Sequence, residues 1–225
     1  MLLTIQSVIS PVNLKKIRDL LAKAEFVDGT LSAGNTAKRV KQNEELASND
    51  NAINELNNLV MNSLITHPEY QTAALPLHIA TPFYARYIKG MAYGDHVDDP
   101  VMGPAHGQRY RSDVSITIFL NEPDEYNGGE LVISSNYGKQ SVKLKAGDAI
   151  MYPSSSVHQV NTVTDGERLV AVTWLQSMIR DTQQRELLYT LNKAREHLIQ
   201  TAPESEHSKH VDISYVNLVR MWSDI

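Results

Sequence analysis

The chain has 225 residues and no cysteine, and its 21 Lys and Arg against 26 Asp and Glu give a formal net charge of -5. This length predicts one globular domain with an appendage, and a hydrophobic fraction of 42% is ordinary for such a chain. The acidic balance argues against duplex DNA or another nucleic acid as a partner, and the lack of cysteine excludes disulfides and thiol chemistry.

The N-terminal part predicts two amphipathic helices that support one face of a sheet. Residues 1–11 carry no basic region and no long apolar run, so we expect no signal peptide and no membrane span. The first helix lies within residues 10–26 and has one apolar stripe, formed by Leu14, Ile17, Leu20 and Leu21. The second spans about 49–66, with Asn49 or Asp50 as its N-cap.

Between these helices, residues 26–46 contain glycine and small polar residues. This composition predicts a loop that packs over a site. Lys38, Arg39 and Lys41 give the loop positive charge, which we interpret as a solvated face.

The middle of the chain predicts a mainly β domain. The expected strands are short and separated by turns rich in Gly, Asn, Pro and Asp: 77–89, 111–120, 130–134, 139–145, 148–152, 157–164 and 167–176. Short strands at even spacing are typical of a β-sandwich or jelly roll.

Two histidines and one aspartate stand at the ends of these predicted strands. Residues 91–96 form a glycine-containing turn that presents His96, and residues i and i+2 of an extended segment share a face. His96 and Asp98 can therefore bind one metal, with His158 arriving from another strand. Two imidazoles and one carboxylate are the ligand set of mononuclear non-haem Fe(II) oxygenases, and they leave positions open for a 2-oxo acid and O2.

Arg168 opens the last predicted strand on the same face as two valines and Trp174. A buried arginine needs an anionic partner, and its guanidinium pairs with a carboxylate through two parallel hydrogen bonds. A dicarboxylate co-substrate would supply that partner. The alternative is a structural ion pair, for example with Glu130 or Asp148.

The surroundings of the ligands are less defined by the sequence. The ring nitrogen that does not bind metal is normally held in such histidines, and Asp95, Asp99 and Gln159 are close enough in sequence to hold it. The segment 99–110 is a candidate substrate lid, and we interpret His106 within it as a loop residue.

After Gln176 the pattern becomes helical. We expect a helix of about twenty residues capped by Asp181 or Thr182, a polar linker over 201–210, and a short apolar helix over 213–225. The first helix has an apolar stripe that packs on the jelly roll or on another copy of the chain, formed by Leu187, Leu191, Ala194 and Leu198. Packing of this stripe on another copy of the chain would make a homo-oligomer. We interpret three histidines near this helix as solvated: His197, His207 and His210.

Several stretches resemble the catalytic core of the prolyl/lysyl-hydroxylase-type Fe(II)/2-oxoglutarate dioxygenases, within residues 82–175. They are YIKG (87–90), YGDHVDDP (93–100), ITIFLN (116–121), GGEL (128–131), AGDAI (146–150), PS (153–154), HQV (158–160) and Arg168. The whole chain is similar to the bacterial stand-alone PKHD-type hydroxylases.

This resemblance implies a fold with a double-stranded β-helix core, which is a cupin-like jelly roll. We divide the chain into an N-terminal helical support region (1–76), the jelly-roll core (77–178) and a C-terminal helical extension (179–225).

The resemblance also implies roles for single residues. His96, Asp98 and His158 match the iron ligands, Arg168 matches the group that binds the distal carboxylate of 2-oxoglutarate, and Tyr87 matches a tyrosine that donates a hydrogen bond to it. The alternative for Tyr87 is a core aromatic with its hydroxyl bonded elsewhere. The sequence also departs from some relatives: Phe119 stands where they carry a tyrosine that contacts the co-substrate. Trp174 and Val160 would line the pocket wall, although ordinary strand packing also explains both.

The implied activity is hydroxylation by Fe(II), 2-oxoglutarate and O2, with oxidative decarboxylation of 2-oxoglutarate to succinate and CO2. Ascorbate is the expected reductant, and the need for Fe(II) favours the reducing cytoplasm. The substrate, a small molecule or a peptidyl side chain, depends on the segments 29–45 and 99–110, whose chemistry the sequence does not reveal.

Two other functions use similar ligands. A non-catalytic iron or metabolite sensor with a jelly-roll fold would have no need of a buried Arg168. A zinc-type cupin isomerase would need more histidine ligands than this chain supplies.

Overall fold

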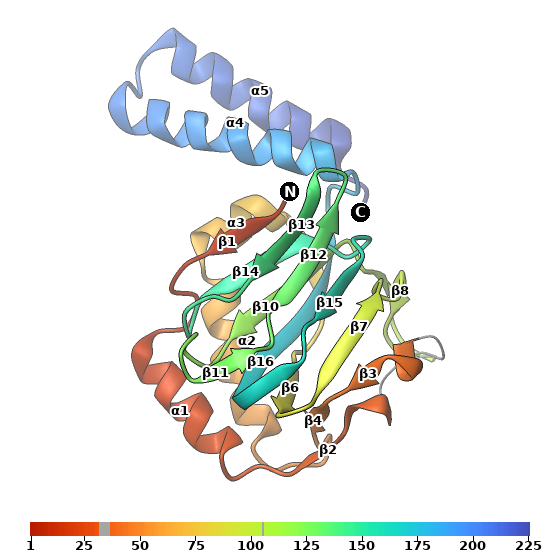
Figure 1. Cartoon of the computed structure of the whole chain (residues 1–225). Helices are drawn as coiled ribbons and strands as arrows, with labels where there is room; N and C mark the ends of the chain where they lie inside the picture. The colour runs from red at the N-terminus through yellow and green to blue at the C-terminus, as the bar shows by residue number, and fades with distance from the viewer. Residues whose placement is uncertain (32–36, 105) are drawn as a thin grey trace.

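The computed structural model describes residues 1–31, 37–104 and 106–225. Over these ranges two β-sheets face each other, helices cover the outer side of the larger sheet, and a helical hairpin projects from one end (Figure 1). This arrangement confirms the predicted mainly β core with flanking helices.

The larger sheet contains nine strands in the described residues, all paired antiparallel where registers are given. Its order is β1 (Leu3–Ile5), β14 (Ala149–Pro153), β10 (Val114–Phe119), β16 (Val163–Ser177), β6 (Phe83–Ile88), β4 (Glu44–Leu46) and β2 (Phe26–Asp28). Strands β5 (Pro76–Ile79) and β11 (Tyr126–Gly128) also pair with β16. The 15-residue β16 therefore organises this sheet.

The smaller sheet has the order β13 (Gly138–Val142), β12 (Leu131–Ser135), β15 (His158–Val160), β7 (Ala92–His96) and β3 (Lys41–Gln42). Two further short strands, β8 (Val101–Met102) and β9 (Tyr110–Arg111), pair with each other. They give the segment 99–110 a hairpin of its own.

Strand β16 separates two hydrophobic cores. Leu169, Ala171 and Leu175 belong to the core under the helices, whereas Val170 belongs to the core between the sheets. This is the alternation of faces that the sequence predicted for the strand. Arg168 has the same parity as Val170 and therefore lies on the inter-sheet face.

Three helices cover the outer face of the larger sheet: α1 (Pro11–Leu21), α2 (Ile53–Ile65) and α3 (Pro68–Ala74). Their apolar stripes are fully buried at Ile17, Leu56, Val60 and Leu64. Burying each such side chain stabilises the fold by about 1.5–3 kcal/mol relative to leaving it exposed. The predicted cap of α2 was wrong: the helix follows Ala52, whose amide donates to Asp50 Oδ1 at 2.8 Å.

The prediction of a loop over residues 26–46 was wrong. The segment forms β2, β3 and β4, which join both sheets, because neighbouring edge strands satisfy its backbone groups. Residues 32–36 of that predicted loop lie outside the described residues. Lys41 is 8% exposed and pairs with Glu45, so it is not on a solvated face, whereas Lys38 and Arg39 are exposed.

Residues 91–96 were also expected as a turn, but they contain β7. This strand pairs with β3 on one side and β15 on the other, so its backbone groups are satisfied by a ladder despite the glycine. The glycine is tolerated because Gly94 packs tightly against Val40, where a Cβ would lie 2.9 Å from the valine Cβ.

The C-terminal hairpin consists of α4 (Thr182–Thr201) and α5 (Glu206–Trp222). The predicted cap of α4 is confirmed, since Asp181 Oδ1 accepts from the amides of Gln183 and Gln184 at 2.8 and 2.9 Å. The linker predicted over 201–210 is partly helical, because the Ser205 hydroxyl caps α5 and Ser208 is buried against the end of α4.

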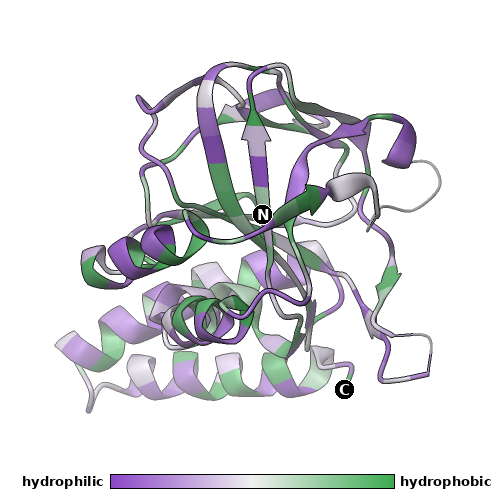
Figure 2. Ribbon diagram, turned by 90° about the horizontal axis from the view of Figure 1, so that it is seen from below, coloured by the Kyte–Doolittle hydropathy of each residue, from purple (hydrophilic) through white to green (hydrophobic). Residues whose placement is uncertain are grey.

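The predicted stripe of α4 is not its buried face. The helix instead buries Arg185, Leu188, Tyr189 and Asn192, while Leu187 is 54% exposed. Hydrophobic residues remain scattered along both helices of the hairpin (Figure 2). In the described part of the chain, no helix has the length and apolar character needed to cross a membrane.

Candidate active site

The three predicted ligands come together between the sheets. His96 ends β7 and lies opposite His158, the first residue of β15, in an antiparallel register. The ligand atoms of His96, Asp98 and His158 all lie within 4.8 Å of one another, and His158 Nε2 is 3.8 Å from Asp98 Oδ1. No other group of this kind occurs among the described residues. His197, His207 and His210 are exposed, as expected.

Backbone carbonyls orient both imidazoles. His96 Nδ1 lies 2.8 Å from the carbonyl oxygen of Gly94, and His158 Nδ1 lies 2.9 Å from that of Ser156. A carbonyl oxygen only accepts, so each Nδ1 carries the proton and each Nε2 keeps a free lone pair. The ring of Tyr93 stacks on His96 at 3.6 Å between centroids and fixes its plane.

The sequence did not decide which groups bond to the Nδ1 atoms of the two histidines. These carbonyls bond to them, rather than Asp95, Asp99 or Gln159. Gln159 instead donates to Asn161 at 2.9 Å. Every residue carries a carbonyl group, so no residue type in the sequence could have identified Gly94 and Ser156.

A buried hydroxyl group, itself in contact with a second one, holds the carboxylate of Asp98. Ser115 Oγ donates to Asp98 Oδ2 at 2.6 Å and lies 2.7 Å from Ser154 Oγ. Ser115 is fully buried on β10, in the sheet opposite β7. Sequence reasoning missed it, although Ser115 and Thr117 alternate with isoleucine in a strand that was otherwise apolar.

The electrostatics of the site keep His96 neutral. Burial is the main cause that lowers the pKa of His96 to about 4, and the neighbouring His158 adds to this shift. The hydrogen bond to Gly94 and the charge of Asp98 oppose this shift. A neutral imidazole with a bare Nε2 is the form that binds a metal ion.

Arg168 lies deeper between the sheets and is 1% exposed. Its guanidinium carbon is 5.0 Å from the Tyr87 ring centroid and 5.6 Å from that of Phe119. Its Nε is buried and has no hydrogen-bond partner among the described residues.

Neither carboxylate that was considered as a structural partner pairs with Arg168. Glu130 accepts from Asn161 at 3.0 Å, and Asp148 accepts from the amide of Ser7 at 2.7 Å. Tyr87 lies opposite Arg168 in the register of β6 and β16. Burial raises the pKa of Tyr87 to about 12, while the charge of Arg168 and the side chain of Asn43 oppose the rise, so the hydroxyl keeps its proton.

The remaining candidates lie on β15, on β16 and in the segment after Asp98. Val160 is 6% exposed in the inter-sheet core, and Trp174 contacts Phe83 edge-on with a centroid distance of 5.6 Å. His106 is exposed, outside the group of three ligands. Residue 105 of the predicted lid lies outside the described residues, and the role of the lid stays a prediction.

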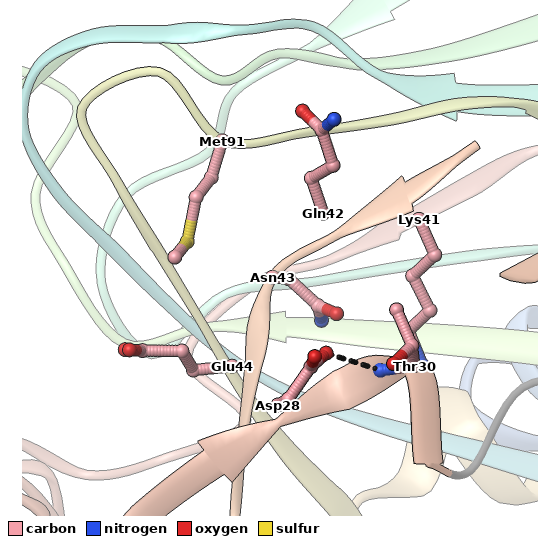
Figure 3. Close-up of a pocket in the computed structure, with 7 residues that line it drawn as sticks. All are labelled: Asp28, Thr30, Lys41, Gln42, Asn43, Glu44 and Met91. Carbon is pink, nitrogen blue, oxygen red and sulfur yellow. Dashed lines mark hydrogen bonds between the residues drawn. The ribbon is translucent and has the colours of Figure 1, made fainter. Parts of the chain in front are cut away.

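A cavity of about 390 Å³, lined mainly by polar residues, lies near the start of β7 (Figure 3). Met91 precedes this strand, whereas His96 ends it, and five residues of strand span about 17 Å. None of the three ligands lines this cavity. Its lining comes mainly from the segment 28–44: Asp28, Thr30, Lys41, Gln42, Asn43, Glu44 and Met91.

Comparison with known proteins identifies the family. The profile of the 2OG-Fe(II) oxygenase superfamily matches residues 82–176. The chain is 51% identical over 225 residues to the PKHD-type hydroxylase of Thioalkalivibrio sulfidiphilus (strain HL-EbGR7), with 100% of both chains covered. It is 46% identical over 224 residues to that of Acaryochloris marina (strain MBIC 11017), again with 100% of both covered.

The chain belongs to the PKHD-type hydroxylases. It is thus an Fe(II)- and 2-oxoglutarate-dependent hydroxylase whose substrate is unknown. The crystal structure of a Pseudomonas putida prolyl-4-hydroxylase has the same fold, with a TM-score of 0.53 at 16% identity over 78% of this chain and 92% of that chain.

The residues of this hydroxylase fit the two groups that the family implies. Two neutral imidazoles and a carboxylate suit Fe(II), and the buried guanidinium of Arg168, whose Nε has no partner among the described residues, suits a carboxylate of 2-oxoglutarate.

The pKa of His96 makes a pH-dependent prediction for the metal-free protein. The pKa of this histidine is about 4 in the folded chain, whereas the ordinary histidine pKa of 6.5 applies in the unfolded chain. Between these two pH values the unfolded chain therefore binds a proton at His96 that the folded chain does not bind. The free energy of unfolding therefore decreases as the pH falls through this range. Long-range ¹H–¹⁵N NMR should show His96 protonated on Nδ1 alone at pH 5.5. A midpoint near 6.5, or a proton on Nε2, would contradict the assignment.

Proposed function

We propose that His96, Asp98 and His158 bind Fe(II), and that Arg168 and Tyr87 bind the distal carboxylate of 2-oxoglutarate, in a hydroxylase acting on a small molecule or a peptidyl side chain. The observation that carries this proposal is the buried guanidinium of Arg168, which has an unpartnered Nε and no paired carboxylate among the described residues. A buried charge left without a partner destabilises a fold, so this position favours an anionic ligand.

The bound groups supply an oxidation in which one atom of O2 enters the substrate as hydroxyl, the other enters succinate, and CO2 leaves. The chain supplies binding and orientation. His96 and His158 present fixed Nε2 atoms, Asp98 is oriented through its hydrogen bond to Ser115, and Arg168 sets the direction of the co-substrate. The apolar core between the sheets excludes water around them.

The sensor alternative receives no support from this geometry. A protein that only binds metal has no use for a buried, unpaired arginine beside the ligands. The same residues allow a direct test that requires no substrate.

Anaerobic titration of the Fe(II)-loaded protein with 2-oxoglutarate should produce the weak visible metal-to-ligand charge-transfer band. Arg168→Ala should weaken 2-oxoglutarate binding by at least about 30-fold, because a charge-assisted pair is lost. Asp98→Ala should abolish iron-dependent turnover.

Arg185→Ala is the matched control, since Arg185 is 3% exposed but donates to the carbonyl of Ile179, within the C-terminal hairpin's base. It should leave co-substrate affinity unchanged. If Arg168→Ala binds 2-oxoglutarate as tightly as wild type does, the assignment of Arg168 to the co-substrate pocket is wrong. If wild-type protein binds iron but gives no charge-transfer band with 2-oxoglutarate, the sensor function is favoured.

The hydrogen bond from Ser115 to Asp98 predicts an effect on metal affinity. Ser115→Ala should weaken Fe(II) binding by about 10- to 100-fold, because partners that orient a ligand typically have effects of this size. Competition with a chelator measures the affinity. Ser208→Ala is the control, since Ser208 is a buried serine bonded to Ala202 in the hairpin. Equal affinities of Ser115→Ala and wild type would refute an orienting role.

Two further proposals come from the resemblance and from iron chemistry. Ascorbate is proposed as the reductant that keeps the iron in the Fe(II) state. A reducing compartment also favours Fe(II), which supports a cytoplasmic location.

We also propose that the C-terminal hairpin mediates self-association. Its outer surface exposes Leu187 (54%) and Ile213 (56%), and a shallow cavity of about 320 Å³ lies on α4 beside Leu187. Light scattering should show an oligomer that Leu187→Glu dissociates. Val12→Glu, an exposed apolar position on α1, should have no such effect. A monomeric wild type would contradict this proposal.

A further inference from the structure

A second polar atom near Arg168 lacks a partner. The hydroxyl oxygen of Tyr126 is buried and has no hydrogen-bond partner among the described residues, and the whole residue is 2% exposed. Buried hydroxyl groups in native proteins are normally hydrogen-bonded, because leaving one unpaired costs free energy. Arg168 Nε and the Tyr126 hydroxyl both lack a well-formed hydrogen bond in the same place, which suits a ligand that bonds to both residues.

The two residues are neighbours in the larger sheet. Tyr126 begins β11 and lies opposite Gly166, two residues before Arg168 on β16. Both side chains pack against Gly129. A Cβ at this position would lie 3.0 Å from Tyr126 Cε2 and 3.2 Å from Arg168 Cδ. The ring of Tyr126 and the stem of Arg168 therefore flank the same glycine.

The backbone after Tyr126 is fixed by two glycines. Gly128 and Gly129 have φ angles of +71° and +67°, and the register shifts between Asn127 and Gly128. A Cβ at Gly128 would lie only 2.1 Å from the carbonyl oxygen of Thr162. No other residue type fits this bend without strain, so the bulge fixes the position of Tyr126 beside β16.

The charge around the Tyr126 ring is positive. Lys143 Nζ lies 3.9 Å from the ring centroid and donates to the carbonyl oxygen of Tyr126 at 2.6 Å. The nearby carboxylate, Glu130, already accepts from Asn161. Burial raises the pKa of Tyr126, while the charge of Arg168 and the approach of its guanidinium to the hydroxyl oppose this rise, so the hydroxyl keeps its proton and faces Arg168. Two cations and a protonated hydroxyl group suit an anion.

We propose that the Tyr126 hydroxyl donates a hydrogen bond to the distal carboxylate of the co-substrate, beside Arg168. The carboxylate is then held from three adjacent strands: by Tyr87 on β6, Arg168 on β16 and Tyr126 on β11. Tyr126 thereby helps to select a 2-oxo acid that carries a second carboxylate. This inference rests on the proposed co-substrate site.

The test compares Tyr126→Phe with Tyr70→Phe. Tyr70 is a matched control because its hydroxyl is also buried and unpartnered in the described residues, but it belongs to the core under the helices. Dissociation constants are measured anaerobically on Fe(II)-loaded protein for 2-oxoglutarate and for 2-oxobutyrate, which lacks the distal carboxylate. Thermal unfolding of the ligand-free protein is the second readout.

Tyr126→Phe should weaken 2-oxoglutarate binding by about 10- to 100-fold, the usual effect of losing a hydrogen bond to a charged group. Its affinity for 2-oxobutyrate should not change. The Tm of the ligand-free variant should equal or exceed that of wild type, because an unpartnered hydroxyl group has been removed. Tyr70→Phe should bind both acids as wild type does.

Three outcomes would count against the inference. Unchanged 2-oxoglutarate affinity in Tyr126→Phe, while Arg168→Ala loses it, would overturn the inference and leave the proposed function standing. Equal weakening for both acids with a lower Tm would show a structural role instead. Wild-type protein that does not bind 2-oxoglutarate would overturn both the inference and the proposed function.

Discussion

The unpaired charge of Arg168 is the constraint on which the site depends. An arginine that is 1% exposed, with an unpartnered Nε, lies in a core whose other members are mostly apolar. Such a charge is tolerated only where the rest of the fold is stable and where a ligand later supplies the counter-charge. The long β16, paired on both sides by β10 and β6, provides that support. Folding energy from the helix-covered face thus maintains a binding site on the opposite face.

The site also requires both sheets at once. The histidines stand on the smaller sheet, whereas the hydroxyl group that holds Asp98 and the arginine stand on the larger one. Ser115 connects the larger sheet to the segment that follows β7 by donating to Asp98 Oδ2. The proposed metal ligands and the residues proposed to bind the carboxylate are therefore positioned by the same inter-sheet packing. A change in that packing should affect metal and co-substrate binding together.

Side chains with a strong chemical preference were predictable from the sequence, whereas groups shared by all residues were not. His96, Asp98 and His158 could be brought together from strand periodicity, and Arg168 could be assigned to the buried face, because alternation fixes which residues share a face. The carbonyls of Gly94 and Ser156 carry no signal in the sequence. Residues 26–28, 41–42 and 44–46 form strands only because neighbouring strands offer partners, which local composition does not encode. The role proposed for Tyr126 depends on the bulge at Gly128, which strand periodicity does not predict.

The most direct test of this account is an anaerobic crystal structure of the protein with Fe(II) and 2-oxoglutarate. The account predicts iron bound by Nε2 of His96 and His158 and by Asp98, with the distal carboxylate of 2-oxoglutarate within hydrogen-bond distance of the Arg168 guanidinium. A co-substrate that lies elsewhere while Arg168 pairs with a protein carboxylate would contradict it.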